Sequence, residues 1–313
     1  MRVQWTQKPI AAHNCKRELQ IFIPVYIVRR KKFPGLLLLA LVALSPALLY
    51  AIEGLNFKPG FNLFSAQQDV ELGQKSAAEV NKQLPLIRDA QVVGYVNGLG
   101  KSLAKAAPAR LQKAGYDWTF NVVNSSEINA FALPGGFIYV NRGAIEAAQN
   151  EAEIAGVIAH EEGHVVMRHG THQASEMMLA QAPLSILGGL LGQSSSLGSQ
   201  LAELGISFGV NSIFLRNSRS AESQADEVGT YILYHAGYDP YAMAQFFTII
   251  QKKYPQQTIQ FFSDHPNPGD RIRNVDQEIP LLGPKRDWKT DSPEFEAIKS
   301  KLERMPPPPK SAR

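Results

Sequence analysis

The five residues from His160 to His164 constrain the fold of this chain more than any other feature of its sequence. They read His-Glu-Glu-Gly-His and follow an apolar run from Ile154 to Ala159. Because four residues turn an α-helix through about 400°, both imidazoles would project from one face at the separation that a single metal ion bridges. The apolar run predicts a buried helix, and a metal ion would remove the cost of burying two histidines and a carboxylate.

The same segment limits the kind of metal site that the chain can build. The sequence contains one cysteine, Cys15, so histidine and carboxylate side chains must supply the ligands. Zinc hydrolases keep three protein ligands and leave one position for water. Glu161, one residue beyond the first histidine, lies where its carboxylate would take a proton from that water instead of binding the metal.

A third ligand is expected on another helix. Glu222 is followed four residues later by Asp226, one turn along the same face of a predicted helix. Such a pair offers one carboxylate to the metal and a second that orients a ligand histidine by a hydrogen bond. Ala225 is small enough to let the two helices approach. Glu176 and Glu203 are also candidates by residue type, although they lie in or beside a stretch rich in Gly and Ser.

Hydrophobic periodicity and helix breakers divide the body of the chain into helices and one small sheet. Helices are predicted over residues 66–83, 90–106, 146–168, 218–236 and 240–253, the third with its stop at Gly170. A strand is predicted over 116–123, and the turn at 134–136 joins strands 129–133 and 137–140. The fold class is therefore expected to be α+β and mostly α-helical, with a small antiparallel sheet or hairpin beside the metal-binding helix.

The N-terminal part of the chain has the composition of a leader. Residues 1–51 hold eight Lys and Arg against one acid, and an uncharged stretch of 20 residues follows the cationic cluster at 29–32. This order predicts export to the periplasm or cell envelope by a signal peptide or an N-terminal anchor. The remaining residues carry 24 basic and 27 acidic side chains, so charge gives no reason to expect a nucleic-acid partner.

Three ordered motifs give the chain a family resemblance. They are segments 160–164 and 222–226 and, upstream, the sequence Asn-Ala-Phe-Ala-Leu-Pro-Gly-Gly over 129–136. Together they resemble the gluzincin zinc metalloproteases of the HtpX and CAAX prenyl protease family, in its soluble BepA-like or Oma1-like envelope branch. The resemblance covers roughly residues 60–282. The chain departs from the BepA pattern because no C-terminal helical repeats are evident in its sequence. It departs from the HtpX pattern because no clear multiple membrane spans are evident.

The resemblance implies a role for each motif residue and a zincin-type metalloprotease fold. It implies that His160, His164 and Glu222 bind one Zn²⁺ per chain. Glu161 would be the catalytic acid and base. Asp226 would not bind the metal itself but would orient a ligand histidine by a hydrogen bond. The strand on which substrate docks would consist of Asn129, Ala130, Phe131, Ala132 and Leu133.

A further match, His265-Pro266 followed by Arg271, is expected close to the metal cleft. The oxyanion that forms when water attacks a peptide carbonyl needs a hydrogen-bond donor, and His265 and Arg271 are the best candidates for these catalytic donors. Alternatively, His265 would occupy the open zinc position and hold the enzyme latent. His169 and His172, just after the metal helix, are expected to face solvent.

Residues 174–210 are rich in Leu, Gly and Ser, and Pro183 interrupts them. Three interpretations stay open for this stretch: a lid over the zinc cleft, a membrane-surface segment, and plain core packing. Membrane association is therefore to be tested for two parts of the chain, the leader and residues 177–191.

These expectations define a leader over residues 1–51, a zinc metalloprotease domain over 52–290 and a C-terminal tail with a Pro-rich end over 291–313. The expected function is an exported zinc endopeptidase that hydrolyses unfolded or misassembled envelope proteins in protein quality control. A zinc-stabilised periplasmic chaperone would use the same ligands and make Glu161 dispensable. A zinc amidase acting on cell-wall peptide shares the chemistry, whereas a di-iron bundle needs a second Glu-x-x-His segment that the sequence does not contain.

Overall fold

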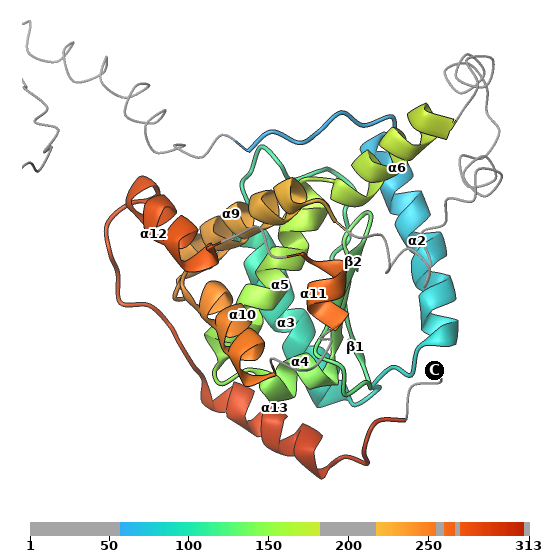
Figure 1. The fold of residues 1–313 in the computed structure, drawn as a ribbon. Helices are drawn as coiled ribbons and strands as arrows, with labels where there is room; N and C mark the ends of the chain where they lie inside the picture. Colours follow the sequence, from blue (N-terminus) through green and yellow to red (C-terminus); the bar gives the residue numbers. More distant parts are fainter. Residues whose placement is uncertain (1–56, 182–216, 255–259, 267–269, 310–313) are drawn as a thin grey trace, which may run out of the picture. The chain divides into compact units, whose positions relative to one another are not determined.

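The computed structural model describes residues 57–181, 217–254, 260–266 and 270–309. The chain divides into two units, residues 1–46 and 47–313, and every described residue belongs to the second. Within the described residues, no helix combines the length and the apolar character that a membrane span requires. The predicted α+β class is confirmed, because helices dominate and three strands form one small sheet (Figure 1).

The first two helices begin and end where the sequence predicts. Helix α2 spans Ala66–Gln83 and starts with a capping box, in which Ser65 and Gln68 bond to each other's backbone N–H groups. Helix α3 spans Ala90–Ala106, and the Asp89 carboxylate accepts hydrogen bonds from the first-turn N–H groups. Both helices are thus fixed by local signals that sequence patterns report well.

The three strands form a mixed sheet in the order β1-β3-β2. Strands β2 (Ala130–Leu133) and β3 (Phe137–Asn141) form the predicted antiparallel hairpin. Strand β1 (Thr119–Val123) adds a parallel pairing on the other side of β3 and begins three residues later than expected. β1 runs parallel to β3 because the connection after β1 leads past the position of β3 to β2, and the hairpin then brings the chain back between them.

The sheet lies between two helical layers. Its outer face packs Phe131 and Tyr139, whose rings stack at 4.9 Å, against Ala77 and Val80 of α2. Its inner face adds Ile138 and its neighbours to the main hydrophobic core. Because successive strand residues alternate between faces, this arrangement fixes which side chains of β2 point toward the main hydrophobic core.

The predicted helix over 146–168 is two helices, α4 (Arg142–Ala147) and α5 (Glu151–Val166). The chain opens at residues 148–150, where the Asn150 side chain caps α5. Every residue of α5 is buried, in agreement with the apolar run in its sequence.

The predicted stop at Gly170 is wrong, because the helix is interrupted by a turn at Arg168 and Gly170 lies inside the next helix, α6 (His169–Gln181). Arg168 has φ of 60°, an unusual conformation for a residue with a side chain. Its guanidinium bonds both carboxylate oxygens of Asp69 at 2.6 and 3.0 Å and thereby holds the turn in place.

Helix α9 (Arg219–Ala236) packs antiparallel along α5 and ends at Gly237, which adopts the left-handed conformation of a helix C-cap. Helix α10 (Ala242–Lys253) covers α5, and α12 (Arg271–Leu282) packs against α9 and α10. The short helix α11 (Gln260–Asp264) leads directly to His265.

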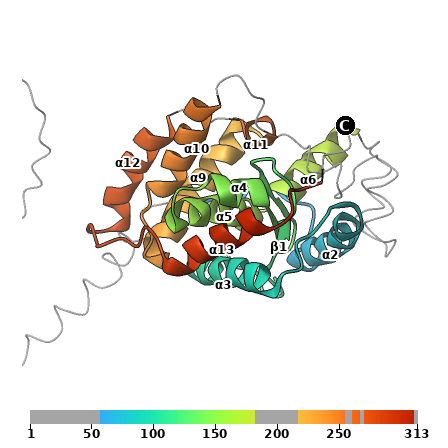
Figure 2. The same ribbon diagram turned by 90° about the horizontal axis from the view of Figure 1, so that it is seen from below.

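Residues 293–304, expected to lie in a tail outside the metalloprotease domain, form helix α13 (Pro293–Arg304). Figure 2 shows α13 beside α3 and α4, and its Phe295, Ile298 and Leu302 are buried in the main core. The tail prediction is wrong for these residues, because the apolar side chains of one helix face complete the core. The prolines that follow, as far as residue 309, lie in no helix or strand.

Candidate metal centre

Helix α5 carries the His-Glu-x-x-His segment into the interior. His160 and Glu161 are fully buried and His164 is 7% exposed, so the burial predicted from the apolar run is confirmed. Gly163 lets α9 approach, because a Cβ at this position would lie 2.8 Å from the carbonyl oxygen of Ala225. The small residues on both helices therefore bring the acidic turn of α9 against the two histidines.

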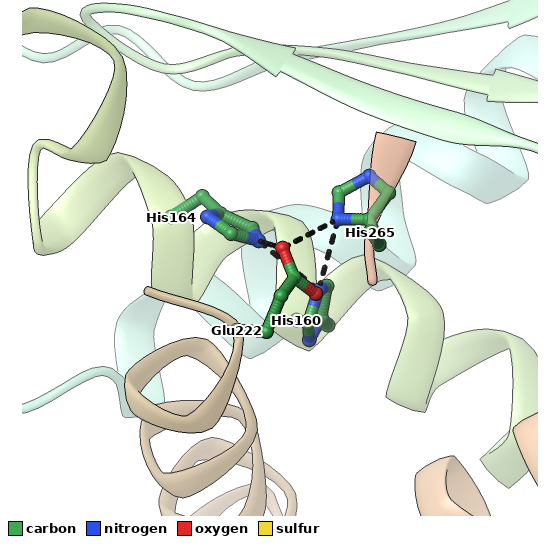
Figure 3. A group of neighbouring side chains, drawn as sticks. All are labelled: His160, His164, Glu222 and His265. Atoms are coloured by element: carbon green, nitrogen blue, oxygen red, sulfur yellow. Dashed lines mark hydrogen bonds and ion pairs between the residues drawn. The ribbon is translucent and has the colours of Figure 1, made fainter. Parts of the chain in front are cut away.

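Four side chains converge between α5, α9 and the end of α11 (Figure 3). Those of His160 and His164 come from α5, Glu222 comes from the first turn of α9, and His265 follows α11. All four residues are buried, and one ligand atom from each lies within 4.8 Å of the others. The structure thus brings together the three sequence-predicted ligands and the residue for which two roles stayed open.

Several pairs of these atoms stand at the spacing of neighbouring ligands on a tetrahedral ion. The Nε2 atoms of His160 and His164 are 3.1 Å apart, and each lies 3.2 to 3.3 Å from a Glu222 oxygen. His265 Nδ1 is 3.3 Å from His160 Nε2 and 3.2 Å from Glu222 Oε1. Tetrahedral zinc with bonds of about 2.0 to 2.1 Å separates its ligands by about 3.3 Å. Three imidazole nitrogens and a carboxylate grouped in this way are a donor set that a divalent cation can bind.

Asp226 and Arg271 support this set from behind. Asp226 Oδ1 accepts a hydrogen bond from His160 Nδ1 at 2.9 Å, which leaves Nε2 as the ligand atom. Arg271 is buried, and it donates to Asp226 Oδ1 at 2.7 Å and lies 3.5 Å from Glu222 Oε2. Burial opposes a charge on His160, but its hydrogen bonds with Asp226 and Glu222 outweigh burial and raise its pKa to about 9.

Glu161 lies next to the ligand group without joining it. Its Oε1 accepts no hydrogen bond from the described residues, and His265 Nε2 lies 3.4 Å away from it. Burial raises the pKa of Glu161 above its ordinary value, although His265 and His160 partly counteract this effect. A buried carboxylate with an unused oxygen can accept a proton from a neighbouring water and return it, as a general acid and base must.

The position of His265 depends on a contact between α11 and the start of β2. Asn129 donates a hydrogen bond from Nδ2 to Asp264 Oδ2 at 3.1 Å, and both side chains are buried. Asp264 directly precedes His265. The side chain of Asn129, predicted to belong to a substrate-docking strand, therefore connects that strand to the residue that completes the donor set.

His169 was expected to face solvent, and this expectation is wrong. It is 4% exposed, and its Nδ1 lies 2.8 Å from His164 Nδ1. Its Nε2 lies 3.0 Å from Gln224 Oε1. Burial lowers the pKa of His169 to about 4, so the ring is neutral at pH 7. The spacing of His164 and His169 alone does not reveal the contact, because the turn at Arg168 produces it.

Strand β2 forms one edge of the sheet and lies over α5. Asn141 N–H bonds the carbonyl of Asn129 at 3.0 Å, so the antiparallel alternation turns the main-chain groups of Ala132 away from β3 and toward the outer edge. A cavity of about 30 Å³ lies beside this edge. Its lining includes Leu133 of β2 and His164 of the donor set.

The stretch over 174–210 is described only as far as residue 181, where it forms the end of α6. The predicted lid, membrane-surface and core interpretations concern mainly residues 182–210, which lie outside the described residues. Glu176, one of the alternative third ligands, is exposed on α6, where it lies near His172. Glu203 also lies outside the described residues.

Two packed helices that hold His, His and Glu around one point, with a free buried Glu and an edge strand beside them, define a metal site of the zincin class. The model of peptidase family M48 matches residues 91–279, which include all four residues of the donor set. The chain belongs to this family. The resemblance seen in the sequence motifs is thus confirmed.

Several curated proteins are similar to this chain over part of their length. The beta-barrel assembly-enhancing protease of Escherichia coli is 29% identical over 217 residues, which are 67% of this chain and 44% of that protein. The mitochondrial metalloendopeptidase OMA1 of Schizosaccharomyces pombe is 30% identical over 54% of this chain and 49% of its own length. The metalloprotease LoiP of Escherichia coli is 30% identical over 51% of this chain and 62% of its own length. The matched part thus spans less than half of the assembly-enhancing protease.

Proposed function

We propose that this protein is a zinc-dependent endopeptidase that hydrolyses peptide bonds of unfolded or misassembled proteins of the cell envelope. One observation carries the proposal: four buried side chains place ligand atoms within 4.8 Å of one another, beside a buried carboxylate that has an unused oxygen. His160, His164 and Glu222 would hold one Zn²⁺ per chain. Membership of peptidase family M48 and the names of the relatives support peptide-bond hydrolysis as the reaction.

A bound zinc ion would lower the pKa of a water molecule to about 7 and polarise the peptide carbonyl. Glu161 would take the proton from the attacking water and deliver it to the nitrogen of the leaving amine. Its raised pKa favours both steps, because a carboxyl group that titrates closer to neutrality both accepts and returns the proton more readily. Asp226 would keep His160 in the tautomer that leaves Nε2 free.

The edge of β2 is the proposed docking site for substrate. An extended polypeptide would add to this edge through the main-chain groups of Ala132, with the residues from Asn129 to Leu133 forming the docking strand. Main-chain pairing places few demands on side chains, so an unfolded segment fits better than a folded surface.

His265 is proposed to hold the site latent. Its Nδ1 completes the donor set at the spacing of a fourth ligand, and zinc sites with four protein ligands are closed to substrate. The alternative role, a hydrogen-bond donor to the oxyanion, requires the His265 ring to leave this position. Arg271 is engaged with Asp226 and Glu222, which supports a positioning role for it more than the expected role as an oxyanion donor.

The location and the biological role complete the proposal. The cationic, then apolar, order of residues 1–51 supports export to the periplasm or envelope, with the leader as a signal peptide or a membrane anchor. A role in protein quality control is supported by similarity to proteins named beta-barrel assembly-enhancing protease, of which this chain matches less than half.

The test is cleavage of an unfolded protein such as casein by the purified full-length chain, with zinc content measured by mass spectrometry. We expect about one zinc per chain in the wild type and in Glu161→Gln, with hydrolysis lost in the variant by a factor of about 10² to 10⁴. Equal hydrolysis by both proteins would contradict the assignment of Glu161. Zinc binding with casein protected from aggregation, and no hydrolysis by either protein, would favour the zinc-stabilised chaperone.

The two roles of His265 predict opposite results for one variant. If the ring blocks the fourth position, His265→Ala raises the hydrolysis rate and leaves zinc bound by the other three ligands. If the ring donates to the oxyanion, the same change lowers the maximal rate by about 10²-fold or more. Asn129→Ala is a second variant with a predicted gain under the latency proposal, because it removes the hydrogen bond to Asp264 that holds His265 in place.

A further inference from the structure

A hydrogen-bonded chain of three side chains connects α9 to one of the proposed metal ligands. Gln224 Oε1 lies 3.0 Å from His169 Nε2, and His169 Nδ1 lies 2.8 Å from His164 Nδ1. The other ring nitrogen of His164, Nε2, faces His160 and Glu222 in the donor set. The chain therefore ends on the ligand ring, at the nitrogen opposite the one that faces the donor set.

The direction of these hydrogen bonds determines which nitrogen of His164 carries the proton. A neutral imidazole has one N–H donor and one acceptor nitrogen. With the Gln224 carbonyl as acceptor, His169 donates from Nε2 and accepts at Nδ1. His164 must then donate from Nδ1, which leaves the lone pair of Nε2 free to bind a metal ion.

The opposite direction would disable the ligand. Rotation of the Gln224 amide would present its NH₂ group to His169, which would then donate from Nδ1 to His164 Nδ1. The His164 proton would move to Nε2, 3.1 Å from His160 Nε2 and inside the donor set. Metal binding is compatible only with the first direction, in which the amide oxygen of Gln224 faces His169.

The fold places His169 on His164 through the turn between α5 and α6. Arg168 adopts its left-handed conformation at this turn, and Asp69 holds its guanidinium by two hydrogen bonds. The first residue of α6 is thereby turned back against the last turn of α5. His172, three residues further along α6, lies instead against the carbonyl of Phe61, away from the donor set.

We propose that His169 is a positioning residue of the metal site, which together with Gln224 fixes the proton of His164 on Nδ1 and directs the Nε2 lone pair to the ion. The inference rests on the proposed function only in that zinc binds to this donor set. It assigns His169 a partner on each side: a carbonyl acceptor on α9 and a ligand histidine on α5.

The first test measures zinc affinity of the full-length protein by competition with a chelating dye. We expect His169→Ala to weaken zinc binding by about 10- to 100-fold, the usual cost of losing such an orienting partner. His169→Asn should recover most of the affinity, because its amide can accept from His164 and donate to Gln224. His172→Ala is the matched control and should bind zinc as tightly as the wild type.

The second test observes the proton itself. In the metal-free protein, ¹H–¹⁵N spectra of the imidazoles should show His164 protonated at Nδ1 in the wild type and in His169→Asn. In His169→Ala we expect a mixture with the Nε2–H form. A role in packing alone would change the melting temperature of the variant without changing this tautomer.

A further pair of variants guards against misfolding of the His169 variants, because Gln224 is only partly buried. Gln224→Glu keeps an acceptor for His169 and should retain affinity. Gln224→Leu removes the acceptor and should weaken zinc binding several-fold. Equal zinc affinity in these two variants would overturn the proposal.

The outcomes separate this inference from the proposed function. If the wild type binds no zinc at this site, the proposed function fails and the inference fails with it. If the wild type binds one zinc and His169→Ala binds it equally well with His164 still protonated at Nδ1, the inference alone is overturned.

Discussion

The two ends of the α5 and α9 pair both bury a glutamate, but they surround it differently. At the end far from the donor set, Glu151 is 2% exposed and accepts hydrogen bonds from the hydroxyls of Tyr238 and Ser292. The ammonium group of Lys289 approaches one of its oxygens at 2.5 Å. This carboxylate is fully satisfied by protein donors and ties the segment before α13 to both helices.

At the other end, Glu222 faces three imidazole rings and the guanidinium of Arg271. The two ligand histidines turn Nε2 toward it, and Asp226 and Glu161 add two more carboxylates within the same few ångströms. Arg271 is the one guanidinium among the described residues that bonds this group. A group of buried carboxylates and imidazoles with one guanidinium among them suits a cation, which supports the proposed metal site at this end, whereas the other end is satisfied by protein donors.

A third arrangement occurs on the far side of α9, where Glu278 of α12 is 8% exposed. Its Oε2 has no hydrogen-bond partner among the described residues. Burial, with additional repulsion from Glu227 and Asp226, raises its pKa to about 8. A buried carboxylate can therefore be stabilised by donors, by a cation or by a proton, and its surroundings indicate which of the three applies.

The strongest test of the comparison applies one substitution at both ends. We expect Glu222→Gln to weaken zinc binding at least about 100-fold and to abolish hydrolysis, because it removes a ligand and not merely an orienting partner. Zinc affinity measured by dye competition checks this result. Glu151→Gln should bind zinc as the wild type does, and Glu176→Gln serves as a control on an exposed glutamate. Wild-type affinity in Glu222→Gln would show that Glu222 is not a ligand.

The second prediction concerns Glu278 and pH. Because its folded pKa of about 8 lies above its ordinary value of 4.5, Glu278 costs no stability below pH 4.5, and its cost grows as the pH rises from 4.5 toward 8. Glu278→Gln removes this cost. We expect the variant to be more stable by about 2 to 4 kcal/mol at pH 9 and equal to the wild type at pH 4.5.

Urea unfolding with a chelator present, at a series of pH values, measures this difference without a contribution from metal binding. A constant gap between Glu278→Gln and the wild type at all pH values would show that the carboxyl group is not protonated in the folded protein.

The third and smallest effect is expected at the donor-rich end. Glu151→Gln should lower the free energy of unfolding by about 2 kcal/mol, because its hydroxyl and ammonium donors lose a charged acceptor. Urea unfolding of the metal-free protein at pH 7 measures this loss. Ser292→Ala, which removes one donor, should cost less. A loss of zinc affinity in Glu151→Gln would contradict the separation of the two ends.

Local patterns predicted those parts of the molecule that one element decides. The bounds of α2 and α3 follow from capping residues and apolar periodicity within a single segment. The hairpin of β2 and β3 follows from a turn of three residues. The chain break at 148–150 and the turn at Arg168 were not predicted, because a long helical periodicity masks a short interruption and no glycine marks the left-handed residue.

Contacts between distant segments decided the remainder. The parallel pairing of β1 with β3 depends on how the chain crosses the sheet, and α13 joins the core because its apolar face meets α3 and α4. No spacing in the sequence relates Gln224 to His169, which are 55 residues apart. The sequence does show that His169 follows the metal-binding helix closely, but it does not show whether the ring points toward that helix or toward solvent.

The sequence by itself indicated the chemistry of the proposed centre: which residues offer ligand atoms, that two of them share one helix face, and that this helix is buried. It did so because a spacing of four residues within a helix is a geometric statement that needs no partner. Only the tertiary structure decided how many side chains meet at the centre, since His265, His169 and Arg271 arrive on other segments. Their positions depend on packing between elements, and packing is fixed by the fold as a whole.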